Sequence, residues 1–257
     1  MLKLFYEGKP LITLMLCAFA FLAAVVDSIG GGGGLISLPA YLLTGLPAAA
    51  ASGSNKFSAC FGTMISVIRY GKGKKLFLKP ALIAAAGAFP MSFVGAWLLQ
   101  HVPDGVARGI LLVGVPIMAA VLLLKKDTPA EPKPLTQKRL ILCFVIGACI
   151  GFYDGFFGPG TGTLLIMLFT WLIGMDMVTA SGSAKIVNLS SNLAALVSYV
   201  IGGNVVYILA IPAMLFSMLG NFVGSQLAMK KGAKLIRTVI FIVLGMIMVK
   251  LIYEWLF

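Results

Sequence analysis

Two glycine-rich stretches interrupt apolar segments at matching places in the two halves of the chain. The first is Asp27 to Pro39 (DSIGGGGGLISLP), and the second is Asp154 to Thr163 (DGFFGPGTGT). Each is followed by a near-copy of one string, AASGSNK ending at Lys56 and TASGSAK ending at Lys185. A shift of 127 positions superimposes the aspartates, and a shift of 129 superimposes the lysines. The chain therefore contains two copies of one unit, and we expect its function to reside where the broken segments meet.

The composition predicts a membrane protein. Of the 257 residues, 60% are hydrophobic and only 11% are charged, with a mean hydropathy of +1.03. Several apolar runs are long enough to cross a bilayer. The alternating polarity of a membrane β-barrel is absent. We therefore expect an all-α, polytopic integral membrane protein.

The net charge of +12 raises the alternative of nucleic-acid binding, but the basic residues form no single patch. Fourteen of the twenty lysines and arginines fall in three short connections, residues 69–79, 125–139 and 230–237. This distribution is typical of cytoplasmic loops. The sequence therefore predicts a multi-pass protein of the plasma membrane, with these three loops cytoplasmic and with no nucleic-acid partner.

Ten apolar segments can be recognised, five in each half. They are residues 11–29, 35–45, 56–70, 80–99, 106–124, 140–153, 163–174, 185–201, 205–229 and 235–256. The polar, proline-rich stretch 125–139 marks the boundary between the copies. We therefore predict a first transmembrane repeat over residues 1–124, a cytoplasmic linker over 125–139 and a second repeat over 140–257.

Two of these segments are too short to span the membrane. Residues 35–45 and 163–174 would rise only about 16–18 Å as helices, against roughly 30 Å of hydrocarbon. They occupy matching places in the halves and directly follow the glycine stretches. They are predicted to be short helices near the bilayer midplane, and whether they cross or re-enter stays open.

The charges of equivalent loops predict that the repeats are inverted. The connection 69–79 carries five basic residues, whereas its counterpart 202–205 carries none. One connection later the bias reverses, since 101–108 has one arginine and 230–237 has four basic residues. Equivalent loops therefore lie on opposite sides of the membrane. Five segments in each half then place both termini outside.

The broken segments are candidate anion sites. Glycines disrupt helical hydrogen bonding, and freed N–H groups at the start of a short helix favour negative charge. The alternative is tight helix packing, because Gly30/Gly34 and Gly158/Gly162 also have GxxxG spacing. The predicted backbone and hydroxyl donors are Gly31, Gly32, Gly33, Gly34, Gly158, Gly160 and Thr161.

Lys56 and Lys185 open corresponding segments in this interpretation, and each begins a polar stripe at helical spacing. A buried ammonium group is costly unless it is paired, so we expect both lysines to compensate the charge of a bound anion. The alternative is that each lysine extends to a nearby membrane interface. Asn55, Asn188 and Asn192 would add neutral donors, although they could equally bond helices together.

Asp27 and Asp154 are the expected partners of the lysines. In an inverted pair, Asp27 and Lys185 both lie toward the cytoplasm, while Asp154 and Lys56 lie toward the outside. The sequence therefore predicts two ion pairs between the repeats, Asp27–Lys185 and Asp154–Lys56. Either aspartate could also carry a coupled proton. The alternative, that each aspartate caps the following helix, stays open.

The paired motifs resemble those of the sulfite exporter TauE/SafE family, also called the toluene sulfonate uptake permease family. The resemblance rests on DSIGGGGGLISLPAYLLTGLP with ASGSNK, and on GFYDGFFGPGTGT with TASGSAKIVNLSSN, and it covers nearly the full chain. It implies a plasma-membrane secondary transporter of sulfur-containing anions such as sulfite, thiosulfate or organosulfonates.

The expected function is therefore transport of such an anion by alternating access, with the anion bound between the repeats. Lys56→Ala or Lys185→Ala is expected to abolish flux while the protein still inserts. No catalytic residue, cofactor or metal is predicted. The partners are a small anion and the lipid bilayer, while proton coupling and a homo-oligomer stay open. An anion channel is the first alternative, followed by a membrane enzyme and a scaffold subunit.

Overall fold

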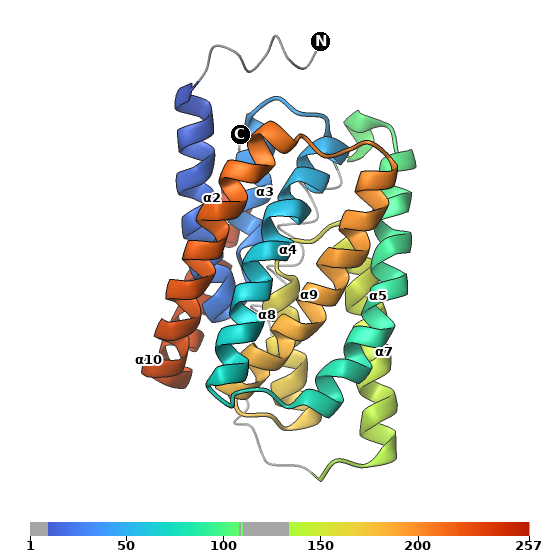
Figure 1. The fold of residues 1–257 in the computed structure, drawn as a ribbon, viewed down its shortest axis with the longest axis vertical. Helices are drawn as coiled ribbons and strands as arrows, with labels where there is room; N and C mark the ends of the chain where they lie inside the picture. Colours follow the sequence, from blue (N-terminus) through green and yellow to red (C-terminus); the bar gives the residue numbers. More distant parts are fainter. Residues whose placement is uncertain (1–9, 108, 110–133, 257) are drawn as a thin grey trace.

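The computed structural model describes residues 10–107, 109 and 134–256, and it gives no side-chain detail for residues 10, 233, 237 and 240–256. The regular elements of these residues are all helices (Figure 1). Those of the first half are α2 (Pro10–Gly30), α3 (Gly34–Leu43), α4 (Ala48–Lys72) and α5 (Leu78–His101). The second half contributes α7 (Gln137–Phe156), α8 (Thr161–Leu168), the π-helix η1 (Phe169–Ile173), α9 (Met177–Ile201) and α10 (Tyr207–Leu256).

Five described helices are long and apolar enough to span a membrane. They are α2, α5, α7, α9 and the part of α10 from Tyr207 to Gly232. The two short segments are also present as helices, Gly34–Leu43 and Thr161–Ile173. The all-α, polytopic membrane architecture is therefore confirmed. The predicted segment 106–124 lies largely outside the described residues, so the count of five segments in each half stays a prediction.

Helices α4 and α9 cross at the centre of the bundle, and the remaining helices pack around them in a reciprocal pattern (Figure 1). Helix α5 packs against α7 and α9, and α10 packs against α2 and α4 in the corresponding way. The start of α4 lies beside the end of α9, because a Cβ atom on Gly53 would overlap the carbonyl oxygen of Asn204. Likewise the start of α9 lies beside the end of α4, because Gly182 meets the carbonyl oxygen of Lys75. Each half therefore packs mainly on the other.

Small residues make the closest of these helix contacts. On α7, Gly147 and Gly151 pack against Ala84 and Ala88 of α5 so closely that a Cβ atom would overlap the α5 backbone. On α10, Gly220 approaches the α2 backbone in the same way. Small residues at a helix interface let the two backbones approach closely, and this close packing stabilises helix pairs in a membrane, where burial of apolar surface gives no driving force for their association. The four-residue glycine spacing on α7 is a signal that the sequence analysis did not use.

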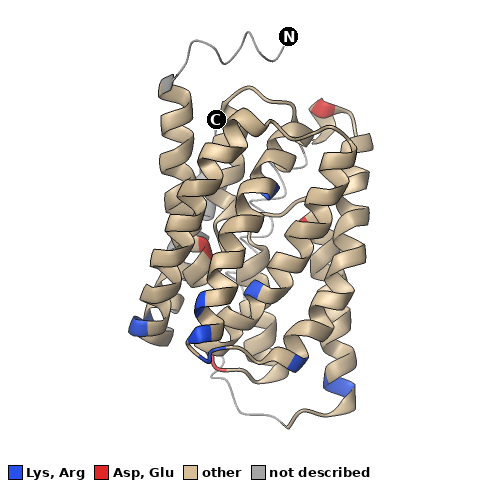
Figure 2. Ribbon diagram, in the orientation of Figure 1, with Lys and Arg blue, Asp and Glu red and all other residues tan. Residues whose placement is uncertain are grey.

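The basic residues gather at one end of the bundle (Figure 2). Lys72, Lys74, Lys75 and Lys79 lie in or beside the turn between α4 and α5, and all four are exposed there. Exposed Lys138 and Lys230 lie toward the same end, because α7 runs alongside α5 in the same direction and Met229 contacts Gly73 in this turn. Helix α2 begins at the opposite end (Figure 1). The charge asymmetry fits a cytoplasmic basic face.

One detail of the predicted segments is wrong. Lys56 and Lys185 do not open their helices, because α4 begins at Ala48 and α9 at Met177, eight residues earlier in each case. Each lysine is preceded by the string Ser-Gly-Ser, at residues 52–54 and 181–183. These serines can lie within a helix when neighbouring elements supply hydrogen-bond partners for their hydroxyl groups. Both lysines therefore lie more than two turns inside the bundle. The last two predicted segments, 205–229 and 235–256, are confirmed as separate helices, because the single label α10 covers two helical parts on either side of a kink with non-helical backbone at Gly232.

Candidate functional site

The two helix breaks are in direct contact. Gly31 follows α2, and its backbone packs on that of Gly162 at the start of α8 so closely that a Cβ atom on either glycine would overlap the other residue. The Thr163 hydroxyl reinforces the contact by donating to the Gly30 carbonyl oxygen at 2.7 Å. Gly31 and its repeat equivalent Gly158 both have positive φ, +80° and +91°, which glycine adopts without strain. The breaks of the two repeats therefore meet inside the bundle.

A polar cavity of about 70 Å³ lies at this junction. One water needs roughly 10–15 Å³ on the same measure, so the cavity has room for several waters or a small oxyanion. It is bordered by both breaks and by α4, α9 and α10. Its polar and glycine lining is Asp27, Gly31, Gly33, Gly34, Ser37, Ser52, Asn55, Lys56, Ser58, Thr63, Asp154, Gly155, Gly158, Thr161, Gly162, Asn188, Asn192, Tyr199, Ser217 and Asn221.

Lys56 lies on the cavity wall and forms an ion pair with the other repeat. Its Nζ atom is 2.7 Å from Oδ2 of Asp154 and donates to Oδ1 of Asn192 at 2.9 Å. Asp154 also accepts hydrogen bonds from the hydroxyls of Ser191 (2.6 Å) and Thr161 (2.8 Å). These bonds offset the cost of burying both charges. Lys56 is the cationic side chain that faces the cavity.

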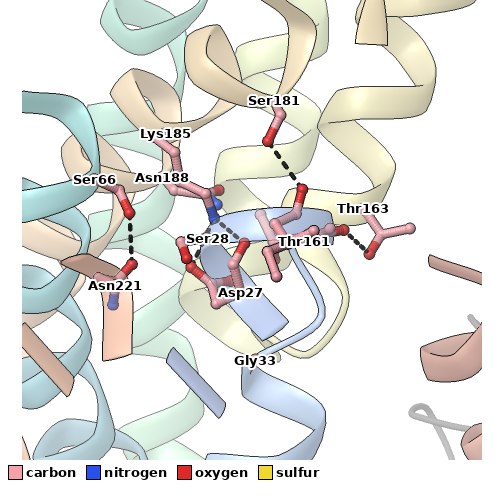
Figure 3. A network of polar contacts seen from close by, with 12 residues as sticks. Asp27, Ser28, Gly33, Ser66, Thr161, Thr163, Ser181, Lys185, Asn188 and Asn221 are labelled. Atoms are coloured by element: carbon pink, nitrogen blue, oxygen red, sulfur yellow. Dashed lines mark hydrogen bonds and ion pairs between the residues drawn. The ribbon is translucent and has the colours of Figure 1, made fainter. Parts of the chain in front are cut away.

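Lys185 forms the second ion pair but does not reach the cavity. Its Nζ atom lies 2.7 Å from Oδ2 of Asp27 and also donates to the Asp27 carbonyl oxygen (Figure 3). The side chain is fully buried, with 0% exposure. Both predicted ion pairs between the repeats are therefore present. The alternative that the lysines extend to a membrane interface is wrong, because each finds a carboxylate inside the bundle.

Most of the predicted binding residues line the cavity. Nine of the twelve do so, together with both aspartates, and the three exceptions are Gly32, Gly160 and Lys185. Lys185 is separated from the cavity because Asp27 lies between them and holds its ammonium group. The side chain of neither aspartate donates to or accepts from the backbone of the following helix, so the capping alternative is not what the structure contains.

The broken end of α2 is held by side chains from three other helices (Figure 3). The last four carbonyl groups of a helix have no partner within it. Here the carbonyl of Asp27 accepts from Lys185, and that of Gly30 accepts from Thr163. The two between them accept from Tyr70 and Ser181, at 2.9 and 3.1 Å. The α2 end is thus fixed in place.

The carbonyl groups at the corresponding end of α7 have fewer side-chain partners in the described residues. The Tyr199 hydroxyl, 129 residues after Tyr70, donates to the Gly155 carbonyl at the longer distance of 3.4 Å. No side chain in the described residues bonds the carbonyls of Phe156 and Phe157. Gly155 and Phe157 line the cavity, and the loop after them is held within the second repeat, because Tyr153 donates to the Pro159 carbonyl and Thr161 to the Gly158 carbonyl.

The near-identical SGS strings dock each repeat on the other. Ser54 accepts the backbone N–H of Val206 at 2.9 Å, and Ser183 accepts that of Phe77 at the same distance. The glycine between the two serines leaves room for the partner loop in each case. The motif therefore has a structural role at its serines and glycine and an electrostatic role at its lysine.

Several donors at the cavity have no partner. Neither α3 nor α8 has a side-chain cap, so backbone N–H groups at Gly33, Gly34 and Gly162 are left for a ligand or water. The Oδ1 atoms of Asn55 and Asn188, which are acceptors, also have no hydrogen-bond partner in the described residues. Unpaired buried polar groups cost free energy, about 1–3 kcal/mol each. A bound ligand with acceptor atoms would satisfy the backbone N–H groups and could accept from the Nδ2 groups of the two asparagines, whereas their Oδ1 atoms need a donor such as water.

The sequence analysis missed the contribution of α10. Ser217 and Asn221 line the cavity, and Asn221 accepts a hydrogen bond from Ser66 of α4 at 2.8 Å. Their signal was present as polar residues four apart in the otherwise apolar stretch 205–229. Tyr199 was also missed, although its equivalence to Tyr70 under the repeat shift could have identified it.

The fold and the buried ion pairs define a polytopic membrane protein with a polar site between two helix breaks. Residues 16–251 match the sulfite exporter TauE/SafE family, and the chain belongs to that family. A relative described as probable membrane transporter protein YfcA, from Escherichia coli strain K12, is 35% identical over 96% of this chain and 91% of its own length.

Two further relatives agree. A probable membrane transporter protein from Haemophilus influenzae is 30% identical over 96% of both chains. Probable membrane transporter protein ORF9 from a Sinorhizobium species is 35% identical over 87% of this chain and 86% of its own length. No solved structure shows a significant match. The protein is a membrane transporter of the TauE/SafE family.

Proposed function

We propose that the protein is a secondary transporter of small sulfur-containing anions, which bind in the cavity between the two helix breaks. One observation carries the proposal: the cavity combines a lysine, the Nδ2 donors of Asn55 and Asn188 and uncapped helix starts. All of these are groups that stabilise an oxyanion. The sulfur chemistry is suggested by the family description, sulfite exporter.

Transport would proceed by alternating access between inverted repeats, with the cytoplasmic side at the basic end and both termini outside. Reciprocal packing of the two halves and the opposed directions of α4 and α9 support this arrangement. Of the two buried lysines, only Lys56 borders the cavity. An anion that enters the cavity would therefore bind Lys56 and the carboxamide groups of Asn55 and Asn188. The α7–α8 break, whose carbonyl groups have fewer side-chain partners than those at the end of α2, is the element that would move.

The test is uptake into proteoliposomes of sulfite, thiosulfate, sulfoacetate and taurine, each offered at matched concentration. Saturable uptake and counterflow of at least one sulfur anion are expected, because one occupied site must reorient before another anion enters. Lys56→Gln should abolish that uptake. The matched control is Lys72→Gln, an exposed lysine on the same helix, which should leave uptake unchanged.

Conductance that does not saturate and shows no counterflow would assign an anion channel instead. Normal uptake by Lys56→Gln would reject the cavity as the binding site. If none of the four compounds is bound or transported while the protein is folded in the membrane, the assignment to sulfur anions fails.

A further inference from the structure

The charges at the junction sum to zero before any anion binds. Lys56 and Lys185 are each paired with one carboxylate, those of Asp154 and Asp27. Among the residues that the structure describes, the cavity lining contains no further lysine, arginine, aspartate, glutamate or histidine. An anion that enters therefore leaves an uncompensated negative charge in a buried region, which is costly. Tight binding requires a cation to enter with the anion.

The two carboxylates are not equally able to take up that cation as a proton. Asp154 is enclosed by three donors, which bond both of its oxygens. Asp27 is bonded only through Oδ2, and its Oδ1 atom has no partner in the described residues. The Asp27 side chain is 21% exposed, against 6% for Asp154, and it lines the cavity. Asp27 thus has an oxygen open to cavity water.

The surroundings of Asp27 can persist when its carboxyl group becomes neutral. Lys185 also donates to the Asp27 carbonyl oxygen, and that bond does not depend on the charge of the side chain. The other ionisable groups that face Asp27 are Tyr70 of α4, which bonds the neighbouring carbonyl of Ser28, and Lys56 across the cavity. The cavity-facing residues of α3, α8 and α10 are not charged. A neutral Asp27 would leave Lys185 as the positive charge that balances the anion.

We propose that Asp27 is the proton-binding site that couples anion transport to protons, one proton for each monovalent anion. The inference rests on the proposed function and adds its coupling partner. Anion and proton bind cooperatively, because each neutralises the charge that the other brings. By linkage, the anion binds more tightly as the pH falls. Lys185 and Asp27 then form the coupling pair, and Lys56 and Asp154 form the anion-binding pair.

Binding of methanesulfonate tests the assignment, because the charge of a sulfonate does not change between about pH 5 and pH 8. For the wild type, Kd should fall with pH by up to about tenfold per unit where one proton accompanies binding. Asp27→Asn mimics the protonated side chain, so its Kd should be independent of pH and close to the tightest wild-type value. Asp154→Asn is expected to weaken methanesulfonate binding, but its Kd should still change with pH as the wild-type Kd does.

Proton uptake by the wild type gives a second measurement, which needs no variant. An entrapped pH-sensitive dye should report one proton moved with each methanesulfonate, and a membrane potential should not change the rate. The proposal is overturned if wild-type binding is independent of pH, if Asp27→Asn keeps the wild-type pH dependence, or if Asp154→Asn alone removes it. Absence of binding and transport of every sulfur anion by the wild type would instead contradict the proposed function.

Discussion

Gly31 and Gly162 touch backbone to backbone, although 131 positions separate them in the chain. Each follows a helix break in its own repeat, and neither leaves space for a Cβ atom. The contact brings the starts of α3 and α8 to one cavity. The two helix breaks can therefore touch because neither glycine carries a side chain, and the charged residues surround this contact.

Gly31→Ala should prevent assembly of the bundle, because the methyl group would overlap the Gly162 backbone. The matched control is Gly160→Ala, since Gly160 has a similar φ of +83° but no atom within 4 Å of an added Cβ. The Gly160→Ala variant should lose only about 1–2 kcal/mol of the free energy of unfolding, which is the cost of placing alanine in the left-handed conformation. Thermal unfolding in detergent measures both. Equal losses for the two variants would show that the backbone contact is unimportant.

Asn188→Leu should separate stability from binding. Its carboxamide has no partner and is buried, so an apolar side chain of similar size removes a desolvation cost and should raise the unfolding temperature. The same change should weaken anion binding at least about tenfold, the equivalent of one lost hydrogen bond to a charged ligand. Asn192→Leu is the contrast, because Asn192 already bonds Lys56. That variant should lose both stability and binding, and a stabilised Asn192→Leu would contradict the assigned roles.

Lys185→Met should strongly destabilise the protein by leaving the Asp27 carboxylate without its partner. Breaking a buried ion pair on one side costs about 3–5 kcal/mol. Adding Asp27→Asn to Lys185→Met should recover much of that loss, because the remaining group is then neutral. Monodisperse yield from the membrane and the unfolding temperature measure the effect. A double variant no better than Lys185→Met would mean that the two residues do not act as a pair.

Ser54→Ala and Ser183→Ala should each cost about 1–2 kcal/mol, because each removes the acceptor of a backbone N–H at the start of the partner segment. The two losses should be similar, since the bonds have the same length of 2.9 Å. Thr238→Ala, at an exposed position of α10, should change stability little. Unequal losses at the two serines would show that the repeats do not use the motif in the same way.

Much of the site could be predicted because it is duplicated. The recurrence of Asp27, Gly31 and Lys56 as Asp154, Gly158 and Lys185 identified the paired positions, and loop charges suggested which aspartate meets which lysine. Both ion pairs are present. The sequence could not place Ser217 or Asn221 at the cavity. Helical spacing shows that two residues share a face, but it does not show which other helix packs against that face.

The sequence by itself determined the membrane class and the duplication, since hydropathy and repeated motifs can be read from the chain alone, and it suggested the pairing of charges without excluding helix capping. Only the tertiary structure decided that the two half-sites differ. Lys56 faces the cavity and Lys185 does not, although they occupy equivalent positions in near-identical strings. The physical reason is packing around the breaks: Lys185 is one of four side chains that bond the carbonyl groups at the end of α2, where Asp27 holds its ammonium group, whereas Lys56 meets Asp154 on the wall of the cavity beside the end of α7.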